Sequence, residues 1–428
     1  MRLGGRLQAA IDILKEVEMQ HRPANESLKD WGLSHRFAGV SDRAAIGNIV
    51  YDALRRRHSL QWRMDSSNVR DLAFGALLDF GGMTIEQVEK SLEGDRFAPH
   101  LPEPKQRKLW EERSLRDAPD YIRGDIPQWC KTHFSFLFSD NWVVEAAALA
   151  TRPSLDLRVN SLKATPEKVS KELSKVKAYA LPWFSQALRI APIEKLSRHP
   201  NVQVEPSFQR GFFEIQDLGS QIISCLVEAK AGMQLLDYCA GAGGKTLALA
   251  AHMGNKGQIY AYDSDKTRLV PIFDRLRRAG VRNVQIRGHT EELKPLIGQM
   301  DIVVLDTPCS GTGTWRRRPD AKWRLTPEQV KRRQAEQCAI LNSSLNYLKQ
   351  GGRLVYMTCS LLISENEEQI SYFLKRYPVF YPVDMKALWQ RHFGSSGVQP
   401  TFSKHGLTLS PAVTQTDGFF LSILQKGC

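Results

Sequence analysis

The sequence has little cysteine and no long apolar run. Its seven cysteines among 428 residues are widely scattered, and no two of them form a Cys-x-x-Cys pair. This pattern disfavours a disulfide framework, a redox dithiol and a structural zinc site, and it favours a reducing cytoplasm. No run of about eighteen apolar residues is present that could span a membrane. The first twenty residues mix charged and apolar side chains, which is typical of an amphipathic helix and not of a secretory signal.

Acidic residues are in the minority. The chain has 59 Lys and Arg against 46 Asp and Glu, which gives a formal net charge of +13. A balance this basic indicates a polyanionic partner. Composition alone is also compatible with an ordinary soluble enzyme that has an excess of surface lysines. The positions of the basic residues are needed to choose between these two interpretations.

The pattern of apolar residues divides the chain into three parts, with no internal repeat and no low-complexity tract. Residues 1–135 are expected to form a helical domain, because apolar residues recur at helical spacing. Residues 136–215 read as a small α+β domain. Residues 216–428 alternate short buried strands with helices, which predicts an α/β fold with a parallel, doubly wound sheet. Its expected strands are 233–240, 257–263, 283–288, 301–306 and 351–360.

A glycine-rich stretch, "DYCAGAGGKT" at 237–246, begins at the end of the first of these strands and leads into a helix. It does not match the phosphate-binding pattern, because Cys239 occupies a position where that pattern needs a glycine. It does not match the dinucleotide-binding pattern either, because Thr246 occupies the position of that pattern's last glycine. The second strand ends in Asp263, where a carboxylate can bind the hydroxyls of a ribose. We therefore expect a nucleoside-containing cofactor. S-adenosylmethionine fits because it carries no phosphate. A simple turn between strand and helix, with Asp263 as a helix cap, would also account for this sequence.

Two cysteines lie where a predicted strand ends: Cys309 just past residues 301–306, and Cys359 in the last residues of 351–360. They should lie at the carboxyl edge of the sheet, beside the cofactor. A thiolate that adds to carbon 6 of a pyrimidine makes carbon 5 nucleophilic enough to attack a methyl sulfonium, and a second group must then assist release. Asp306, at the end of the same strand as Cys309, could hydrogen-bond the edge of the base.

A basic and aromatic segment follows Cys309. Guanidinium groups and tryptophan rings suit single-stranded RNA, in which cations meet phosphates and planes stack on unpaired bases. The residues expected to contact RNA here are Trp315, Arg316, Arg317, Arg318 and Lys322.

Several motifs together resemble the Sun/Fmu-type (NOL/NOP/Sun) RNA (cytosine-5) methyltransferases. The resemblance covers roughly residues 150–425 and rests on the following stretches: "RVNSLK" at 158–163, "FFEIQDLGSQ" at 212–221, the glycine loop, "DTPCSGTGTWRRRPD" from 306, "YMTCS" from 356 and "TDGFF" at 416–420. It implies a class I Rossmann-like methyltransferase domain, preceded by a small α+β domain and a helical domain similar to the antitermination factor NusB.

The resemblance also implies roles for single residues. Cys359 would be the nucleophile and Cys309 would assist product release. S-adenosylmethionine would be held by Asp263, Asp306 and the loop residues Cys239, Ala240, Gly241, Ala242, Gly243, Gly244 and Lys245. The α+β domain would contact RNA through Arg158 and Asn160. A metal-free monomer acting in the cytoplasm on RNA, most simply ribosomal RNA, is the expectation.

The sequence departs from the family pattern in two places. Gly241 and Ala242 stand where the family usually has Ala-Pro. Gly288 and His289 stand where it commonly has Gly-Asp, so His289 would have to replace a carboxylate at the adenine of the cofactor. Transfer RNA as substrate, an inactive RNA-binding assembly factor of the same fold, and a methyltransferase for proteins or small molecules remain alternatives.

Overall fold

The computed structural model describes residues 1–427, in two compact units. The helical unit comprises Met1–Pro153, Pro192–His199 and Thr314–Leu325, and the sheet unit comprises Ser154–Ala191, Pro200–Gly313 and Thr326–Cys428. Cys428, the last residue of the predicted domain 216–428, lies outside the described residues. The observed units differ from the expected boundaries at 135 and 215. Helices continue beyond residue 135, and two later segments belong to the helical unit.

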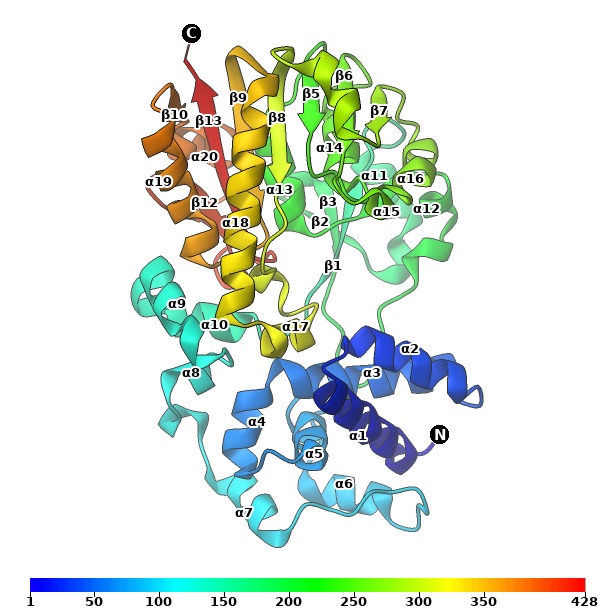
Figure 1. Ribbon diagram of the computed structural model, residues 1–428. Coiled ribbons are helices and arrows are strands. Elements are labelled where there is room, and N and C mark those ends of the chain that lie inside the picture. Colours follow the sequence, from blue (N-terminus) through cyan, green and yellow to red (C-terminus); the bar gives the residue numbers. More distant parts are fainter. Residues whose placement is uncertain (428) are drawn as a thin grey trace. The chain divides into compact units, whose positions relative to one another are not determined.

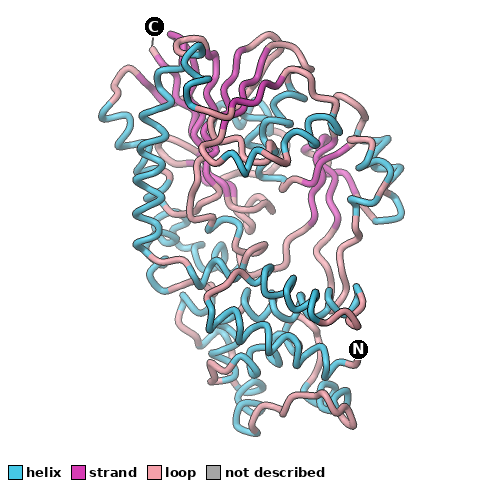
Figure 2. The backbone as a smooth tube through the Cα atoms, turned by 45° about the vertical axis from the view of Figure 1, so that its right-hand side comes forward, coloured by secondary structure: helices cyan, strands magenta, loops and turns pink. Residues whose placement is uncertain are grey.

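The helical unit contains no strand among its described residues, as the cyan tube in Figure 2 shows. The apolar stripe of its first helix, which includes Leu7 and Leu14, packs on Ile46, Ile49 and Leu72 of later helices. Its α-helices are α1 (Leu3–Gln20), α2 (Ala24–Ser34), α3 (Val40–Arg55), α4 (Arg57–Met64), α5 (Val69–Asp79), α6 (Ile85–Leu92), α7 (Pro104–Glu112), α8 (Asp120–Arg123), α9 (Lys131–Phe138), α10 (Trp142–Ala148) and α17 (Pro319–Arg324).

A small antiparallel sheet begins the sheet unit. Its strands run in the order β2-β3-β1-β4, with β1 at Leu155–Val159, β2 at Tyr179–Leu181, β3 at Phe184–Ile190 and β4 at Phe213–Ile215. Two helices accompany them, α11 (Pro166–Glu172) and α12 (Pro206–Gln209). The side chain of Thr165 accepts a hydrogen bond from Lys168 N at 3.4 Å, so it caps α11.

A large mixed sheet forms the body of the sheet unit (Figure 1). The strand order is β11-β12-β13-β9-β8-β5-β6-β7, with β10 paired to β13. Strands β5 to β9 are parallel, and each overlaps one of the five runs expected from the sequence, whereas β13 is antiparallel to β9. The bounds are β5 Gln234–Asp237, β6 Gln258–Tyr262, β7 Val284–Arg287, β8 Met300–Asp306, β9 Leu348–Thr358, β10 Phe380–Pro382, β11 Thr401–Phe402, β12 Leu407–Leu409 and β13 Phe419–Lys426.

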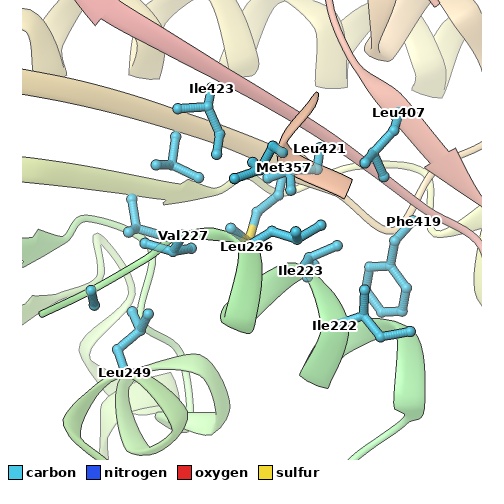
Figure 3. Close-up of a cluster of buried hydrophobic side chains, with 14 of the residues drawn as sticks. Ile222, Ile223, Leu226, Val227, Leu249, Met357, Leu407, Phe419, Leu421 and Ile423 are labelled. Atoms are coloured by element: carbon cyan, nitrogen blue, oxygen red, sulfur yellow. The ribbon is translucent and has the colours of Figure 1, made fainter. Parts of the chain in front are cut away.

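Helices cover both faces of this sheet, because its strands are apolar on both sides. Val304 and Val355 face a core shared with α13 and α14, whereas Val303 and Leu354 face a core shared with α18 and α19. Figure 3 shows Ile222 of α13 among the labelled side chains of the first core. The helices are α13 (Leu218–Leu226), α14 (Gly244–His252), α15 (Lys266–Leu269), α16 (Ile272–Ala279), α18 (Pro327–Ser344), α19 (Glu367–Arg376) and α20 (Met385–Phe393).

The order of the strands determines where a ligand can bind. The chain continues from β5 to β6 on one side of the sheet and later adds β8 on the other side of β5. In open α/β sheets this reversal leaves a crevice at the carboxyl ends of the strands. The loops after β5, β6, β8 and β9 therefore meet at one edge. No described helix is both long and apolar enough to cross a membrane.

Candidate active site

The two cysteines expected at the sheet edge lie side by side. Asp306, the last residue of β8, pairs with Met357 of β9, and Thr307 N donates to Met357 O at 3.1 Å. The loops that follow these strands therefore begin in register. The Sγ atoms of Cys309 and Cys359 are 3.4 Å apart, and both residues are free thiols. The pairing of β8 with β9 thus brings together two residues that are fifty positions apart in the chain.

Cys309 holds its proton tightly. The hydrogen bond to Cys359 raises the pKa of the Cys309 thiol well above its usual range, and burial and the charge of Glu365 act in the same direction. At 3.4 Å the two sulfurs are within hydrogen-bonding distance of each other, and either thiol can be the donor.

An ion pair lies at the start of both the glycine loop helix and the Cys309 loop. Nζ of Lys245, in the first turn of α14, is 2.5 Å from Oδ2 of Asp306. Burial alone would lower the pKa of Lys245, but the charge and the hydrogen bond of Asp306 outweigh it and raise the pKa. Lys245 is therefore a cation and a hydrogen-bond donor next to the carboxylate that was expected to hold a base.

The glycine loop requires glycine for its shape. Gly241 has φ +49° and Gly243 has φ +80°, in the left-handed region that favours glycine. A Cβ atom on Gly243 would come within 2.4 Å of Ile272. The loop closes onto the next strand, because Ala240 N donates to Tyr262 O at 2.8 Å. The backbone can therefore approach a ligand at the start of α14.

The acids around the loop fit a nucleoside cofactor. Asp263 accepts hydrogen bonds from Gly241 N at 2.9 Å and from Asp265 N at 3.0 Å, and Arg268 lies 3.3 Å from it. A carboxylate has about four acceptor sites, so Asp263 retains capacity for ribose hydroxyls. Asp237 is buried, and its Oδ1 has no hydrogen-bond partner in the protein. Burial raises the pKa of Asp237 to about 7. An unsatisfied oxygen beside the loop suits a ligand that brings a donor.

The rest of the predicted cofactor site lies at the same edge. Cys239 is buried in the loop, where burial raises its pKa well above the usual range, so it is an inert thiol. Ala242 is exposed, and its carbonyl oxygen accepts from Arg275 at 2.7 Å. His289 follows β7, is exposed, and has Nε2 2.9 Å from Nζ of Lys266. Within residues 1–427, no cluster of three or more His, Cys, Asp or Glu side chains could hold a metal ion.

Most of the segment 315–324, which was expected to contact RNA, is packed inside the helical unit. The ring of Trp315 is 0% exposed and stacks on Phe134 with centroids 6.3 Å apart. Lys322 is also 0% exposed and donates to Arg55 O at 2.8 Å, while Arg55 Nε donates to Arg316 O at 2.8 Å. Burial lowers the pKa of Lys322 to about 8.

Two further residues expected to contact RNA are buried in the sheet unit. Arg158 donates to Gln216 Oε1 at 2.6 Å, and Asn160 donates to the carbonyl oxygens of Gly211 and Ala279. The structure thus gives Arg158, Asn160, Trp315, Arg316 and Lys322 almost no surface to offer to a nucleic acid. Of the residues expected to contact RNA, Arg318 is exposed and Arg317 is half-buried.

Trp315 and Arg318 should therefore respond differently to substitution. Trp315→Ala removes a fully buried ring and is expected to cost about 3–5 kcal/mol of stability in the helical unit. Arg318→Ala removes an exposed side chain and is expected to change stability by at most about 0.5 kcal/mol. Thermal and urea unfolding of both variants checks this. Equal unfolding of Trp315→Ala and the wild type would show that the burial of this ring contributes nothing.

The pattern of residues gives no reason to select Glu365. It is fully buried behind the two cysteine loops and accepts hydrogen bonds from both. The sequence hardly distinguishes it from its neighbours, because the stretch "ISENEE" is typical of the polar first turn of a helix. Only the fold shows that one of these acids points inward while Glu367 and Glu368 do not share its partners.

Known proteins resemble this chain over most of its length. Residues 224–425 match the family model described as 16S rRNA methyltransferase RsmB/F. A probable ribosomal RNA small subunit methyltransferase B from Synechocystis sp. is 32% identical over 334 residues, which are 75% of this chain and 72% of the relative. The ribosomal RNA small subunit methyltransferase B of Enterobacter sp. is 33% identical over 70% of this chain and 66% of its own length.

Solved structures agree in fold. A methyltransferase homologue from Pyrococcus horikoshii is 27% identical and matches with a TM-score of 0.60, over 73% of this chain and all of its own. The protein PH0851 matches over the full length of both chains with a TM-score of 0.74 and 23% identity, which shows the likeness of fold alone.

The Rossmann-like sheet, the glycine loop and these matches define an S-adenosylmethionine-dependent RNA methyltransferase. More particularly, the chain belongs to the RsmB/F family of 16S rRNA methyltransferases. The sequence-based expectations of fold, family and cofactor are therefore confirmed.

Proposed function

We propose that the protein methylates carbon 5 of a cytosine in ribosomal RNA, in the cytoplasm, through a covalent adduct between Cys359 and carbon 6. The observation that carries the proposal is the 3.4 Å separation of the Cys309 and Cys359 sulfurs at the edge that holds the cofactor loop. A methyltransferase that transfers to an oxygen or nitrogen nucleophile needs no such pair. The names of the curated relatives support ribosomal RNA as the substrate.

Attack begins at Cys359. Its thiolate adds to carbon 6 of the cytosine and forms a carbon–sulfur bond, which places electron density on carbon 5. Asp306 and Lys245, held together at 2.5 Å, offer an acceptor and a donor to the polar edge of the base. S-adenosylmethionine supplies the electrophilic methyl group that carbon 5 takes up. The base must be unpaired or flipped out to reach the thiolate.

Release then depends on Cys309. The hydrogen bond to Cys359 and its charge are among the causes that keep the Cys309 pKa high. Both disappear once the Cys359 sulfur is bonded to carbon 6, so Cys309 loses its proton to solvent more readily. Its thiolate can then take the proton from carbon 5. The carbon–sulfur bond breaks, the electron pair returns to Cys359, and 5-methylcytosine is free to leave.

Methyl transfer to purified RNA tests the proposal. Small-subunit ribosomal RNA from cells that lack this activity is incubated with methyl-labelled S-adenosylmethionine and the protein, with transfer RNA in parallel. We expect label in ribosomal RNA, recovered after digestion as 5-methylcytosine. Label confined to transfer RNA would show that transfer RNA is the substrate. Label in a base other than cytosine would overturn the mechanism through the two cysteines. RNA binding without any transfer would favour an inactive assembly factor.

A further inference from the structure

Glu365 is a fully buried carboxylate that the reaction outlined above does not use. It ends the 3-10 turn Ile363–Glu365 that follows the Cys359 loop. Four hydrogen bonds converge on it. Ser310 N donates at 2.8 Å, Ser360 Oγ at 2.5 Å and Gln337 Nε2 at 3.0 Å, and the hydroxyl of Ser310 donates as well.

The donors to Glu365 are the direct neighbours of the two cysteines. Ser310 follows Cys309, and Ser360 follows Cys359. One carboxylate therefore joins both loops, and the two serine hydroxyls lie 3.1 Å from each other. Gln337 of α18 adds a second hold on the Cys309 loop, because its Nε2 also donates to Pro308 O at 3.0 Å. Cys309 is thus held from the residues before and after it.

A glutamate side chain satisfies this arrangement better than an amide would. All four groups that point at Glu365 are neutral donors, and a carboxylate offers about four acceptor sites. A buried charge is tolerated when hydrogen bonds saturate it. An amide in its place would offer one acceptor oxygen and turn an NH₂ group toward donors, so part of the set would lose its acceptor. Glutamate is consequently favoured over an amide at this position.

We propose that Glu365 is a positioning residue that keeps the Cys309 and Cys359 loops at the separation needed for release to follow attack. The proposal rests on the proposed function. Attack needs only the sulfur of Cys359, whereas release needs the sulfur of Cys309 beside the same base. Weaker hydrogen bonding between Glu365 and the two loops should therefore slow product release more than it slows the attack by Cys359. A misplacement of about 1 Å can cost roughly a hundredfold in rate.

The test separates the two steps in Glu365→Gln. We expect kcat to fall about 10- to 100-fold, with the KM values for RNA and S-adenosylmethionine within about twofold of wild type. The hydrogen-bond partners of Glu365 are Ser310, Ser360 and Gln337, and none of these was expected to hold either ligand. The covalent protein–RNA species, which is transient in wild type, should accumulate on denaturing gels although Cys309 is present. Glu365→Asp keeps the charge on a shorter arm and should recover part of the rate. Ser310→Ala removes one donor and should show the same split in milder form if Glu365→Gln does not fold.

Glu367→Gln is the matched control. Glu367 lies two positions further on and accepts from Ser403 Oγ at 2.6 Å and His405 N at 3.4 Å, away from both cysteine loops. Its kcat and adduct level should equal those of wild type. Loss of activity in Glu365→Gln without adduct, or a rise in KM alone, would overturn the positioning role. If wild type itself forms no 5-methylcytosine, the proposed function fails instead.

Discussion

Cys359→Ala is expected to abolish methyl transfer, with a loss on the order of 10⁴-fold or more, while RNA binding persists. The alanine removes the only atom of this residue that could bond to carbon 6, and without that bond carbon 5 of cytosine is too weak a nucleophile. Cys359 is half-buried at the end of β9, so the substitution deletes one sulfur and leaves the strand pairing intact. Transfer of label to RNA and a filter-binding assay, run on the same preparation, measure both properties.

Cys338→Ala is the control for this substitution. Cys338 is another half-buried free thiol, on α18, where Asn342 Nδ2 lies 3.6 Å from its sulfur. It should keep full activity. Substantial transfer by Cys359→Ala would mean that the carbon 6 adduct is formed by Cys309 or not at all, and the assignment of the nucleophile would have to be reversed or abandoned.

Cys309→Ala is expected to stop the reaction one step later. Cys359 can still attack and the methyl group can still be transferred, but the thiol that lies 3.4 Å from Cys359 is then missing and cannot take the carbon 5 proton. The protein should remain covalently bound to its RNA, as a species that survives denaturing electrophoresis and carries the methyl label. Turnover should fall by about 10²–10⁴-fold, the usual contribution of a positioned acid or base.

The double variant Cys309→Ala, Cys359→Ala provides the control for this trapped species. It should form no adduct, because the attacking sulfur is gone as well. Normal turnover by Cys309→Ala would show that water or another group removes the carbon 5 proton, and the two-cysteine mechanism would not hold for this protein.

The parts of the site that belong to the sheet were predictable from sequence, because they depend on local patterns. Short apolar runs between helical segments located β5 to β9, and the positions just beyond these strands contained the loop glycines, Cys309 and Cys359. Thr326 and Gln329 form a capping box, which likewise marks the start of α18 by a local pattern. Strand ends and helix caps are set by neighbours a few residues away, so a single sequence contains the information.

The RNA-contact residues were not predictable in the same way. Arginine and tryptophan after Cys309 have the composition of a nucleic-acid surface, yet Trp323 Nε1 donates to Leu54 O, 269 residues earlier, and Trp315 stacks on Phe134. Arg158 and Asn160 are buried for the same reason, since their partners come from distant parts of the chain. The partner of a long polar side chain is a property of the fold. Composition cannot distinguish a surface cation from a buried one that hydrogen-bonds carbonyl groups.

The excursion of residues 314–325 into the helical unit has a consequence for how the protein is made and dissected. Phe134 and the carbonyl groups of Leu54 and Arg55 are synthesised long before Trp315, Lys322 and Trp323, their partners. During translation the amino-terminal helices therefore lack these packing partners until nearly three quarters of the chain has left the ribosome. For the same reason residues 1–153 expressed alone lack a piece of their own core. A truncation meant to isolate this unit should carry the segment 314–325 joined to it by a designed linker.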